Sequence, residues 1–285
     1  MKGIILAAGR GTRLYPMTKT VCKPLLPVYD KPLIYYSIEV FLLAEIKDIL
    51  IIVPPGEIPQ FAALLGNGID FGVRISYKEQ PVPRGIADAF IIGEDFIGGD
   101  SVCLMLGDNI FYAENLEQKL LLGKKKQKGA AVFGYYVDDP RPFGVVEFDE
   151  KGNAVSIEEK PQNPKSNYII PGLYFYDSSV IDIAKDLKPS KRGELEITDV
   201  NFAYLNQGQL QVITLSDDTL WLDAGNADAL LESSVKIAEL QRQTGKLIGC
   251  PEATAYKKHY IDSKQLREIG EKLKMTVYGR YLLSL

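Results

Sequence analysis

The chain has 285 residues, of which 46% are hydrophobic and 25% charged, and its formal net charge is −4 at pH 7. This composition is typical of a soluble globular protein that buries a sizeable core, either as one domain or as two fused lobes. The acidic balance argues against a nucleic-acid backbone or an anionic membrane surface as partner, and leaves room only for local cationic sites.

Short apolar runs rich in branched side chains alternate with helical patterns through the first half of the chain. The strand-like runs are GIILAA (3–8), ILIIV (49–53), RISYKEQ (74–80), SVCLMLGD (101–108) and AAVFGYYV (130–137). The helical segments between them are KPLIYYSIEVFLLAE, EIPQFAALLG, IADAFIIGEDF and LEQKLLLGKKKQ. This alternation predicts an α/β fold in which a mixed, mainly parallel sheet is covered by helices.

The pattern changes after about residue 138. FGVVEFDEKGNAVSIEEKP and IIPGLYFYD are typical of antiparallel strands, with a turn at DEKGN. From Ala227 onward, ADALLESSVKIAELQRQTG and DSKQLREIGEKL have helical spacing. We therefore expect a first half at 1–137, a smaller lobe at 138–226 and a mainly helical C-terminal region at 227–285, packed on the same globule.

The first strand runs into a glycine-rich turn, LAAGRGTR (6–13). Such a turn lets the backbone approach a ligand, and its N–H groups can line a phosphate. The turn lacks the third glycine of a dinucleotide fingerprint and the GK[ST] of a P-loop, which argues against an NAD-dependent oxidoreductase and a Walker ATPase. Taken alone, it is as consistent with a structural connector as with a phosphate cradle. The nearby cations Arg13 and Lys23 favour the phosphate site, although both residue types are usually exposed solubilising charges.

Two aspartates each follow an apolar segment of the sequence, one in the motif LGDN and the other in WLDAG. Asp108 follows a strand at the position where open α/β sheets place ligand-binding residues. A carboxylate there is costly to bury unless it meets a cation, which favours metal binding. Asp223 likewise follows an apolar segment. Taken alone, however, each of the two motifs more often forms a simple turn.

The long motif LAAGRGTRLYPMTKTVCKPLLPVYDKPLIYY resembles that of the sugar nucleotidyltransferase family. Nine further segments resemble, in order and spacing, those of the thymidylyltransferase branch of that family. They are KEQPVPRGIADAFIIGEDFIG, LGDNIFY, FGVVEFD, EEKP, KSNYIIPGLYFYD, RGELEITDVN, WLDAG, CPEATAYKKHYID and YGRYL. The resemblance covers nearly the whole chain. It implies a Rossmann-like nucleotide-diphospho-sugar transferase fold and Mg²⁺-dependent transfer of a nucleotidyl group from dTTP to α-D-glucose 1-phosphate, giving dTDP-glucose and pyrophosphate.

The resemblance also implies a nucleotide site over the glycine turn. The residues it assigns there are Leu6, Ala8, Gly9, Gly11, Thr12, Arg13, Lys23, Gln80, Gly85 and Asp108. Arg13 and Lys23 would hold the pyrophosphate leaving group, and Gln80 with the Gly85 backbone would read the base edge. The alternative for Gln80 is a strand-end amide that caps a loop.

The family pattern makes Asp108 and Asp223 the Mg²⁺ ligands. It places Glu159 on glucose hydroxyls, Lys160 on the sugar phosphate, and the Gly144 backbone and Ile170 around the sugar. The alternative for the EEKP motif is a solvated hairpin edge.

The implied chemistry is in-line attack by the sugar phosphate on the α-phosphorus, without a covalent intermediate. Because this nucleophile is ionised at neutral pH, no general base is needed. That fits a chain with a single histidine, His259, in a polar stretch away from the motifs. Catalysis then depends on positioning and charge neutralisation by Arg13, Lys23, Lys160 and the metal at Asp108.

Several positions depart from the commonest family pattern. Pro24 replaces a glutamine, Ala7–Ala8 replaces Ala-Gly, and Phe143 replaces a tyrosine, which affects ribose and sugar contacts. The stretch FYAENL lacks the usual histidine, which weakens the carry-over of a feedback site for dTDP-rhamnose.

Alternative functions are a UTP- or CTP-using pyrophosphorylase and a noncatalytic nucleotide-sugar sensor. The three widely spaced cysteines, Cys22, Cys103 and Cys250, fit reduced thiols. Met1 leads straight into a strand rather than a signal peptide, and no apolar run approaches the roughly 18 residues of a membrane span. We expect a cytoplasmic protein and, from the family, a homotetramer.

Overall fold

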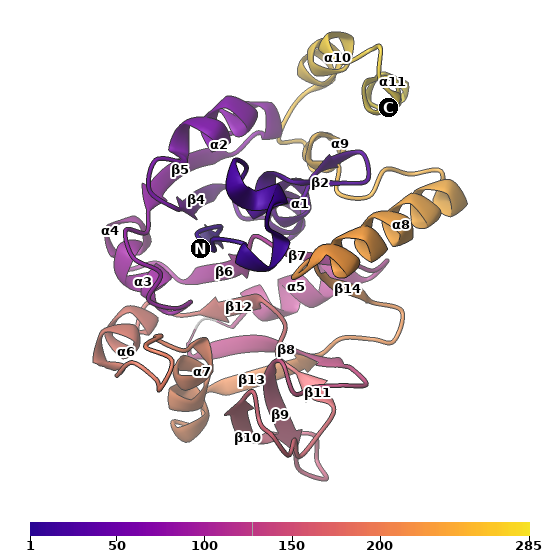
Figure 1. The fold of residues 1–285 in the computed structure, drawn as a ribbon. Helices are drawn as coiled ribbons and strands as arrows, with labels where there is room; N and C mark the ends of the chain where they lie inside the picture. Colours follow the sequence, from indigo (N-terminus) through magenta and orange to yellow (C-terminus); the bar gives the residue numbers. More distant parts are fainter. Residues whose placement is uncertain (127) are drawn as a thin grey trace.

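The computed structural model describes residues 1–126 and 128–285, and within them the main sheet has ten strands. These are β1 (Lys2–Leu6), β4 (Asp48–Val53), β5 (Arg74–Glu79), β6 (Val102–Leu106), β8 (Ala130–Tyr136), β9 (Gly144–Phe148), β10 (Ala154–Glu159), β11 (Tyr168–Ile169), β12 (Leu173–Tyr176) and β13 (Leu210–Thr214). Their order is β10-β9-β11-β8-β12-β6-β1-β4-β5, with β13 beside β8 (Figure 1). The predicted mixed α/β sheet is confirmed, and one sheet runs through both expected halves.

The first half of the sheet is parallel. β1 pairs in parallel with β4 and β6, and β4 pairs in parallel with β5. Successive side chains of β1 enter opposite cores: Ile5 belongs to the core under one helical layer and Ile4 to the core under the other. Strands that are buried on both faces read as continuous apolar runs, which is why the sequence reveals them.

Strand direction changes beyond β6. β12 is antiparallel to β6, and β8 is antiparallel to β12 but parallel to β13. The run AAVFGYYV, which the alternation assigns to the parallel part, therefore lies largely among antiparallel neighbours. A buried apolar run carries no information about direction, because the connections on either side set it. The hairpin predicted around DEKGN is confirmed as β9–β10.

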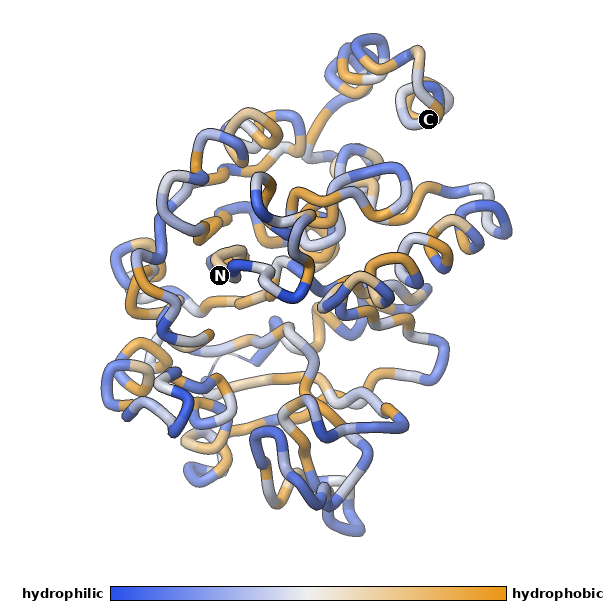
Figure 2. The backbone as a smooth tube through the Cα atoms, in the orientation of Figure 1, coloured by the Kyte–Doolittle hydropathy of each residue, from blue (hydrophilic) through white to orange (hydrophobic). Residues whose placement is uncertain are grey.

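Helices cover both faces of the sheet (Figure 1), and in Figure 2 the helices alternate between hydrophilic and hydrophobic positions along the backbone. One face carries α1 (Ile34–Leu43), α2 (Ile58–Leu65) and α5 (Leu116–Lys124). The other carries α3 (Asp88–Ile92), α4 (Glu94–Ile97), α6 (Val180–Asp186) and α7 (Ile197–Asn206). The segment IADAFIIGEDF forms two short helices around Gly93, and of LEQKLLLGKKKQ only Gln127 lies outside the described residues.

Two short ladders stand beside the main sheet: β2 (Pro27–Val28) with β3 (Lys31–Pro32), and β7 (Asn109–Tyr112) with β14 (Leu220–Asp223). A small core, to which Val28 and Leu222 belong, joins both ladders to the long C-terminal helix. The β7–β14 ladder brings the chain after β6 next to the chain that leads into the C-terminal region.

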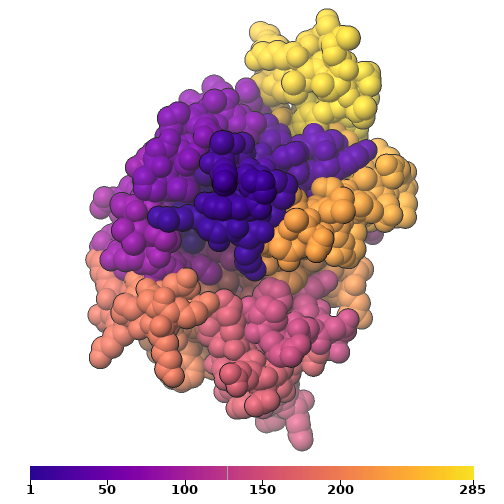
Figure 3. Space-filling model, viewed as in Figure 1, coloured from indigo at the N-terminus to yellow at the C-terminus, as the bar shows by residue number. Residues whose placement is uncertain are grey.

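The C-terminal region is helical, as predicted. Its helices are α8 (Ala227–Thr244), α9 (Pro251–Lys257), α10 (Ser263–Lys272) and α11 (Val277–Ser284). The Asn226 side chain caps α8 by accepting from the Ala229 N–H, and Gly245 ends it in a left-handed conformation. Figure 3 shows α10 and α11 projecting from one end of the molecule. Among the described residues, no helix has the length and apolar character needed to cross a membrane.

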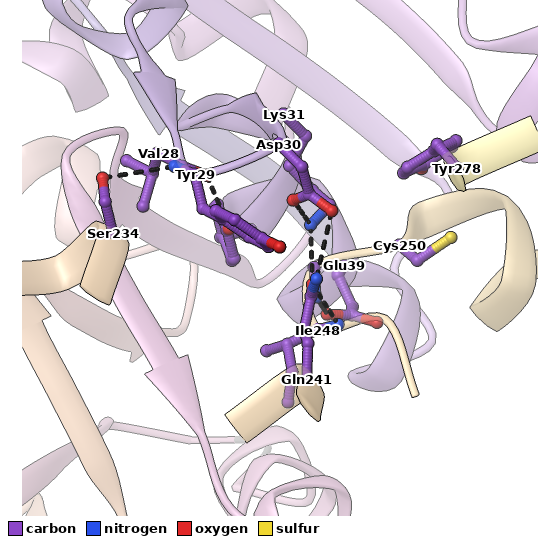
Figure 4. A network of polar contacts seen from close by, with 12 residues as sticks. Val28, Tyr29, Asp30, Lys31, Glu39, Ser234, Gln241, Ile248, Cys250 and Tyr278 are labelled. Atoms are coloured by element: carbon purple, nitrogen blue, oxygen red, sulfur yellow. Dashed lines mark hydrogen bonds and ion pairs between the residues drawn. The ribbon is translucent and has the colours of Figure 1, made fainter. Parts of the chain in front are cut away.

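A buried polar network ties this region to the first half (Figure 4). The buried Lys31 ammonium donates to Asp30 and to Gln241 Oε1, the latter at 3.0 Å. The Glu39 carboxylate of α1 accepts from the Gly249 N–H at 2.6 Å and from the Thr254 hydroxyl at 2.9 Å. Because buried charges are costly without partners, these bonds fix α8 against the β2–β3 ladder and α9 against α1.

Candidate nucleotide and sugar phosphate site

A cavity of about 1010 Å³ opens where the two halves of the sheet meet. The predicted site residues that line it are Arg13, Asp108, Gly144, Glu159, Lys160, Ile170 and Asp223. The remaining predicted residues, Leu6, Ala8, Gly9, Gly11, Thr12, Lys23, Gln80 and Gly85, lie outside this lining set. The structure thus brings the predicted metal-binding and sugar-binding residues to one cavity. Most of the glycine turn and the predicted base-binding residues lie outside its lining.

The glycine turn after β1 is held by its own loop. Gly11 is left-handed, with φ 59°, and its carbonyl accepts from the Thr18 hydroxyl at 2.7 Å. A Cβ at Gly11 would lie 3.0 Å from the Thr18 methyl carbon, so a side chain there would strain the left-handed backbone and press against Thr18. The turn leads into a short 3-10 helix, Thr12–Leu14, which presents the exposed Arg13 to the cavity.

Lys23 lies between the two predicted metal ligands. Its buried ammonium is 2.5 Å from Asp108 Oδ2 and 4.0 Å from Asp223 Oδ1. Asp108 lies between β6 and β7, immediately before Asn109, and Asp223 ends β14. The β7–β14 register pairs Asp223 with Asn109. The main chain of that ladder therefore sets the separation of the two carboxylates.

The electrostatics of this pair fit a divalent cation. Burial, followed by the negative charge of Asp108, raises the pKa of Asp223 to about 6, and the cations Lys23 and Arg13 act in the opposite direction. Two carboxylates that disfavour each other's charge are the oxygen ligands Mg²⁺ prefers, with phosphate and water completing its shell. Within the described residues no group of three or more His, Cys, Asp or Glu side chains forms a fuller protein cage.

The side of the cavity that carries the predicted sugar-binding residues is formed by the β9–β10 hairpin. The register pairs Glu159 with Gly144, and the Gly144 carbonyl accepts from the Ile170 N–H at 2.9 Å. The Glu159 carboxylate accepts from the Thr198 hydroxyl at 2.5 Å and lies 3.5 Å from the Lys160 ammonium. Lys160 has a left-handed backbone, with φ 46°, an uncommon conformation for a residue with a side chain and one that concentrates at functional sites.

The base candidates lie at the end of β5. The Gln80 N–H donates to the Val53 carbonyl at 2.8 Å, and its side chain is buried. Gly85 has φ 105°, and a Cβ there would lie 2.5 Å from the Leu195 carbonyl oxygen. Only glycine fits, because the Gly85 backbone packs directly against the backbone of Leu195.

Sequence reasoning missed several polar partners. Arg192 Nη2 donates to Glu159 Oε1 at 3.3 Å and to Glu196 Oε2 at 2.8 Å, which brings a guanidinium beside the sugar candidates. Trp221 Nε1 donates to Asn109 Oδ1 at 2.6 Å, and both line the cavity. All of these residues except Glu159 stand inside the quoted motifs RGELEITDVN, LGDNIFY and WLDAG, where spacing alone gave no reason to select them.

A family model described as nucleotidyl transferase matches residues 2–240, most of the chain. The chain belongs to this nucleotidyl transferase family. Within the family it is 52% identical to a glucose-1-phosphate thymidylyltransferase of Neisseria gonorrhoeae, over 100% of this chain and 99% of that protein. It is 51% identical to a glucose-1-phosphate thymidylyltransferase of Mycobacterium tuberculosis, again over 100% of this chain and 99% of that protein.

Solved structures agree with the family. A crystal structure from Bacillus anthracis, described as a glucose-1-phosphate thymidylyltransferase in complex with sucrose, has a TM-score of 0.77 at 42% identity and covers 83% of this chain and 94% of that chain. A UDP-glucose pyrophosphorylase with bound UDP-glucose has a TM-score of 0.73 at 24% identity, over 84% and 98% of the two chains, and supports the fold alone. The predicted nucleotidyltransferase family, fold and enzyme class are confirmed.

Proposed function

We propose that the protein transfers a thymidylyl group from dTTP to glucose 1-phosphate, releasing pyrophosphate and forming dTDP-glucose. The observation that carries the proposal is the meeting of Lys23, Asp108 and Asp223 beside a cavity whose other wall holds Glu159 and Lys160. The half-identical, full-length thymidylyltransferase relatives support the choice of substrates.

The residues supply charge and alignment. Arg13, on the glycine turn, neutralises the departing pyrophosphate, and Lys23 adds a second cation at the same side. A magnesium ion held by Asp108 and Asp223 would contribute positive charge to phosphate oxygens. Because the sugar phosphate is ionised already, no side chain needs to remove a proton, and the reaction is accelerated by holding the two substrates in line.

The second half holds the acceptor. Glu159 accepts hydrogen bonds from sugar hydroxyls, and its position is fixed by Thr198 and Arg192. Lys160 places an ammonium next to Glu159, where it contacts the sugar phosphate. Residues 1–137 thus act as the nucleotide half and 138–226 as the sugar-phosphate half.

A test of the proposed function compares dTTP, dUTP and UTP as donors for glucose 1-phosphate, by pyrophosphate release with and without Mg²⁺. Thymine and uracil share the same hydrogen-bonding edge, so only the methyl group and the missing 2′-hydroxyl separate dTTP from UTP. A methyl-sized pocket discriminates by about 1–3 kcal/mol, so we expect dTTP to have the highest kcat/KM and UTP to react more slowly. CTP, ATP and GTP should be poor donors.

The same assay decides between the alternatives. A higher kcat/KM for UTP than for dTTP would replace the thymidylyl assignment with a uridylyl one. No pyrophosphate release with any nucleotide, alongside measurable binding of nucleotide sugars, would support the noncatalytic sensor instead.

We also propose that the protein is a cytoplasmic homo-oligomer, a tetramer as in the family. The outward face of α8 supports association, since Leu231 and Val235 are 65% and 48% exposed, one helical turn apart. Light scattering coupled to size-exclusion chromatography would measure the mass, and a monomer at micromolar concentration would contradict this proposal.

A further inference from the structure

Asp88 has a buried carboxylate that lies beside the predicted base-binding residue Gln80. It opens α3, and its side chain is only 1% exposed. One oxygen, Oδ1, accepts from Arg84 Nη2 at 2.6 Å, and the other, Oδ2, accepts from Gln80 Nε2 at 2.9 Å. A carboxylate that is buried at this depth needs both partners, because an unpaired one is costly.

The neighbours of Gln80 decide which way its side-chain amide faces. Gln80 Nε2 also donates to the Gly85 carbonyl, at 3.4 Å. The Asp88 carboxylate and the Gly85 carbonyl can only accept hydrogen bonds, so the amide must turn its NH₂ group toward both. In the part of the chain that the structure describes, Gln80 Oε1 accepts no hydrogen bond, and it is not among the buried unpaired atoms. Gln80 therefore offers an incoming ligand an acceptor.

We propose that Asp88 is a positioning residue for base selection, which fixes the Gln80 amide so that Oε1 accepts the N3–H of thymine or uracil. Cytosine carries a lone pair at N3 in place of this hydrogen, so the fixed acceptor repels it. The inference rests on the proposed function, in which Gln80 reads the base. It deepens that function by giving the reason why pyrimidines with an N3–H are chosen over cytosine.

Arg84 makes the Asp88→Asn variant informative. The guanidinium can only donate, so it keeps the oxygen of an asparagine facing itself and turns the new NH₂ group toward Gln80. A flip of the Gln80 amide, with Oε1 toward residue 88 and Nε2 toward the base, then restores the hydrogen bond to residue 88 and gives up the longer 3.4 Å bond to the Gly85 carbonyl. A flipped Gln80 offers a donor, which suits N3 of cytosine and opposes the N3–H of thymine.

The experiment measures kcat/KM for dTTP and for dCTP with glucose 1-phosphate, in the wild type and in Asp88→Asn. We expect the dTTP-to-dCTP ratio to fall at least about tenfold in the variant, mainly through KM, because one hydrogen-bonding position changes from acceptor to donor. Equal losses for both nucleotides, with an unchanged ratio, would show a structural role only and would overturn the inference.

Two further variants sharpen the test. Arg84→Ala alone leaves Asp88 facing Gln80 and should keep the wild-type ratio. In the double variant Asp88→Asn/Arg84→Ala the asparagine is free to turn its oxygen to Gln80, so the dTTP preference should return at least in part. A double variant that resembles Asp88→Asn, or an Arg84→Ala variant that loses the preference, would contradict the proposed mechanism.

If Asp88→Asn does not fold, as judged by its thermal unfolding, Asp88→Ala replaces it. This variant removes the acceptor without adding a donor, so the ratio should fall several-fold but not reverse, and an unchanged ratio would overturn the inference. Failure of the proposed function gives a different result. A wild-type enzyme that uses dCTP as well as dTTP would refute base reading by Gln80. Wild-type selectivity that is retained in every Asp88 variant would refute only the role of Asp88.

Discussion

At the scale of single residues, substitutions of Asp108 and Asp223 are expected to reduce activity strongly. Replacing either one with Asn removes a carboxylate that pairs with Lys23 and that is proposed to hold Mg²⁺. Turnover should fall at least about a hundredfold, the effect of losing a positioned electrostatic group, while the fold is retained. Steady-state pyrophosphate release and circular dichroism measure the two effects.

The matched control is Asp218→Asn, which changes an exposed aspartate in the loop before β14 and should leave turnover unchanged. If Asp108→Asn or Asp223→Asn keeps near-normal turnover, the metal assignment is wrong.

Lys160 is predicted to act on only one substrate. Its ammonium lies beside Glu159, on the side of the cavity where the sugar phosphate is proposed to bind. Lys160→Ala should therefore raise KM for glucose 1-phosphate about tenfold or more and leave dTTP binding nearly unchanged, because one charged hydrogen bond to the sugar phosphate is lost. Lys165→Ala, at a more exposed position paired with Glu147, serves as the control. A comparable weakening of dTTP binding would argue against the assignment.

At this scale the sequence reveals residues but not their partners. The resemblance selects Asp108, Asp223 and Lys23 one by one, yet nothing in the spacing indicates that the lysine lies between the aspartates. Gln80 was open to two interpretations, a base reader or a loop cap, and its contact with Asp88 depends on how β5 meets α3. Contacts between side chains distant in the chain arise from packing, which a single sequence does not display.

At the scale of elements, a buried carboxyl group between α9 and α11 makes the stability of the folded protein depend on pH. Burial raises the pKa of Glu252, in α9, from 4.5 to about 6, although a hydrogen bond from the Tyr278 hydroxyl of α11 opposes the shift. The folded protein thus holds this proton more tightly than the unfolded chain. Protonation of Glu252 therefore makes its full contribution to the stability of the fold below about pH 4.5, and this contribution is lost as the pH rises through about 6.

Glu252→Gln keeps an acceptor for Tyr278 but never ionises. We expect the variant to exceed the wild type in free energy of unfolding by about 2 kcal/mol at pH 8 and to match it near pH 4.5, since one pKa unit corresponds to 1.36 kcal/mol. Denaturant unfolding at several pH values measures this difference, with the exposed Glu271→Gln of α10 as control. A constant difference at all pH values would mean that Glu252 does not titrate as described.

The elements themselves are largely predictable. The runs ILIIV and SVCLMLGD correspond to β4 and β6 because parallel, doubly buried strands need uninterrupted apolar side chains. The short strands β7 and β14 were not recognised, since each has only four residues and no long alternation. Their pairing depends on the tertiary path of the chain, and it is this pairing that assembles the two aspartates.

At the scale of the whole molecule, one continuous sheet connects the two sides of the cavity at which the substrates are proposed to bind. β6 and β12 join the parallel and antiparallel parts through an uninterrupted ladder, and the cavity lies across that junction. The α9–α11 helices lie at the end of the molecule away from the β9–β10 hairpin, and the network around Lys31 and Glu39 holds α8 and α9 to the nucleotide half (Figures 1 and 4).

The β7–β14 ladder also determines when, during synthesis of the chain, the two aspartates can come together. The ribosome delivers the glycine turn, Lys23 and Asp108 early, but β14 and Asp223 come only after the whole sugar-binding hairpin has been made. A nascent chain that has folded its first half carries one carboxylate against the lysine and lacks the second. The pair of carboxylates proposed to hold the metal is therefore complete only after the hairpin proposed to bind the acceptor has been synthesised.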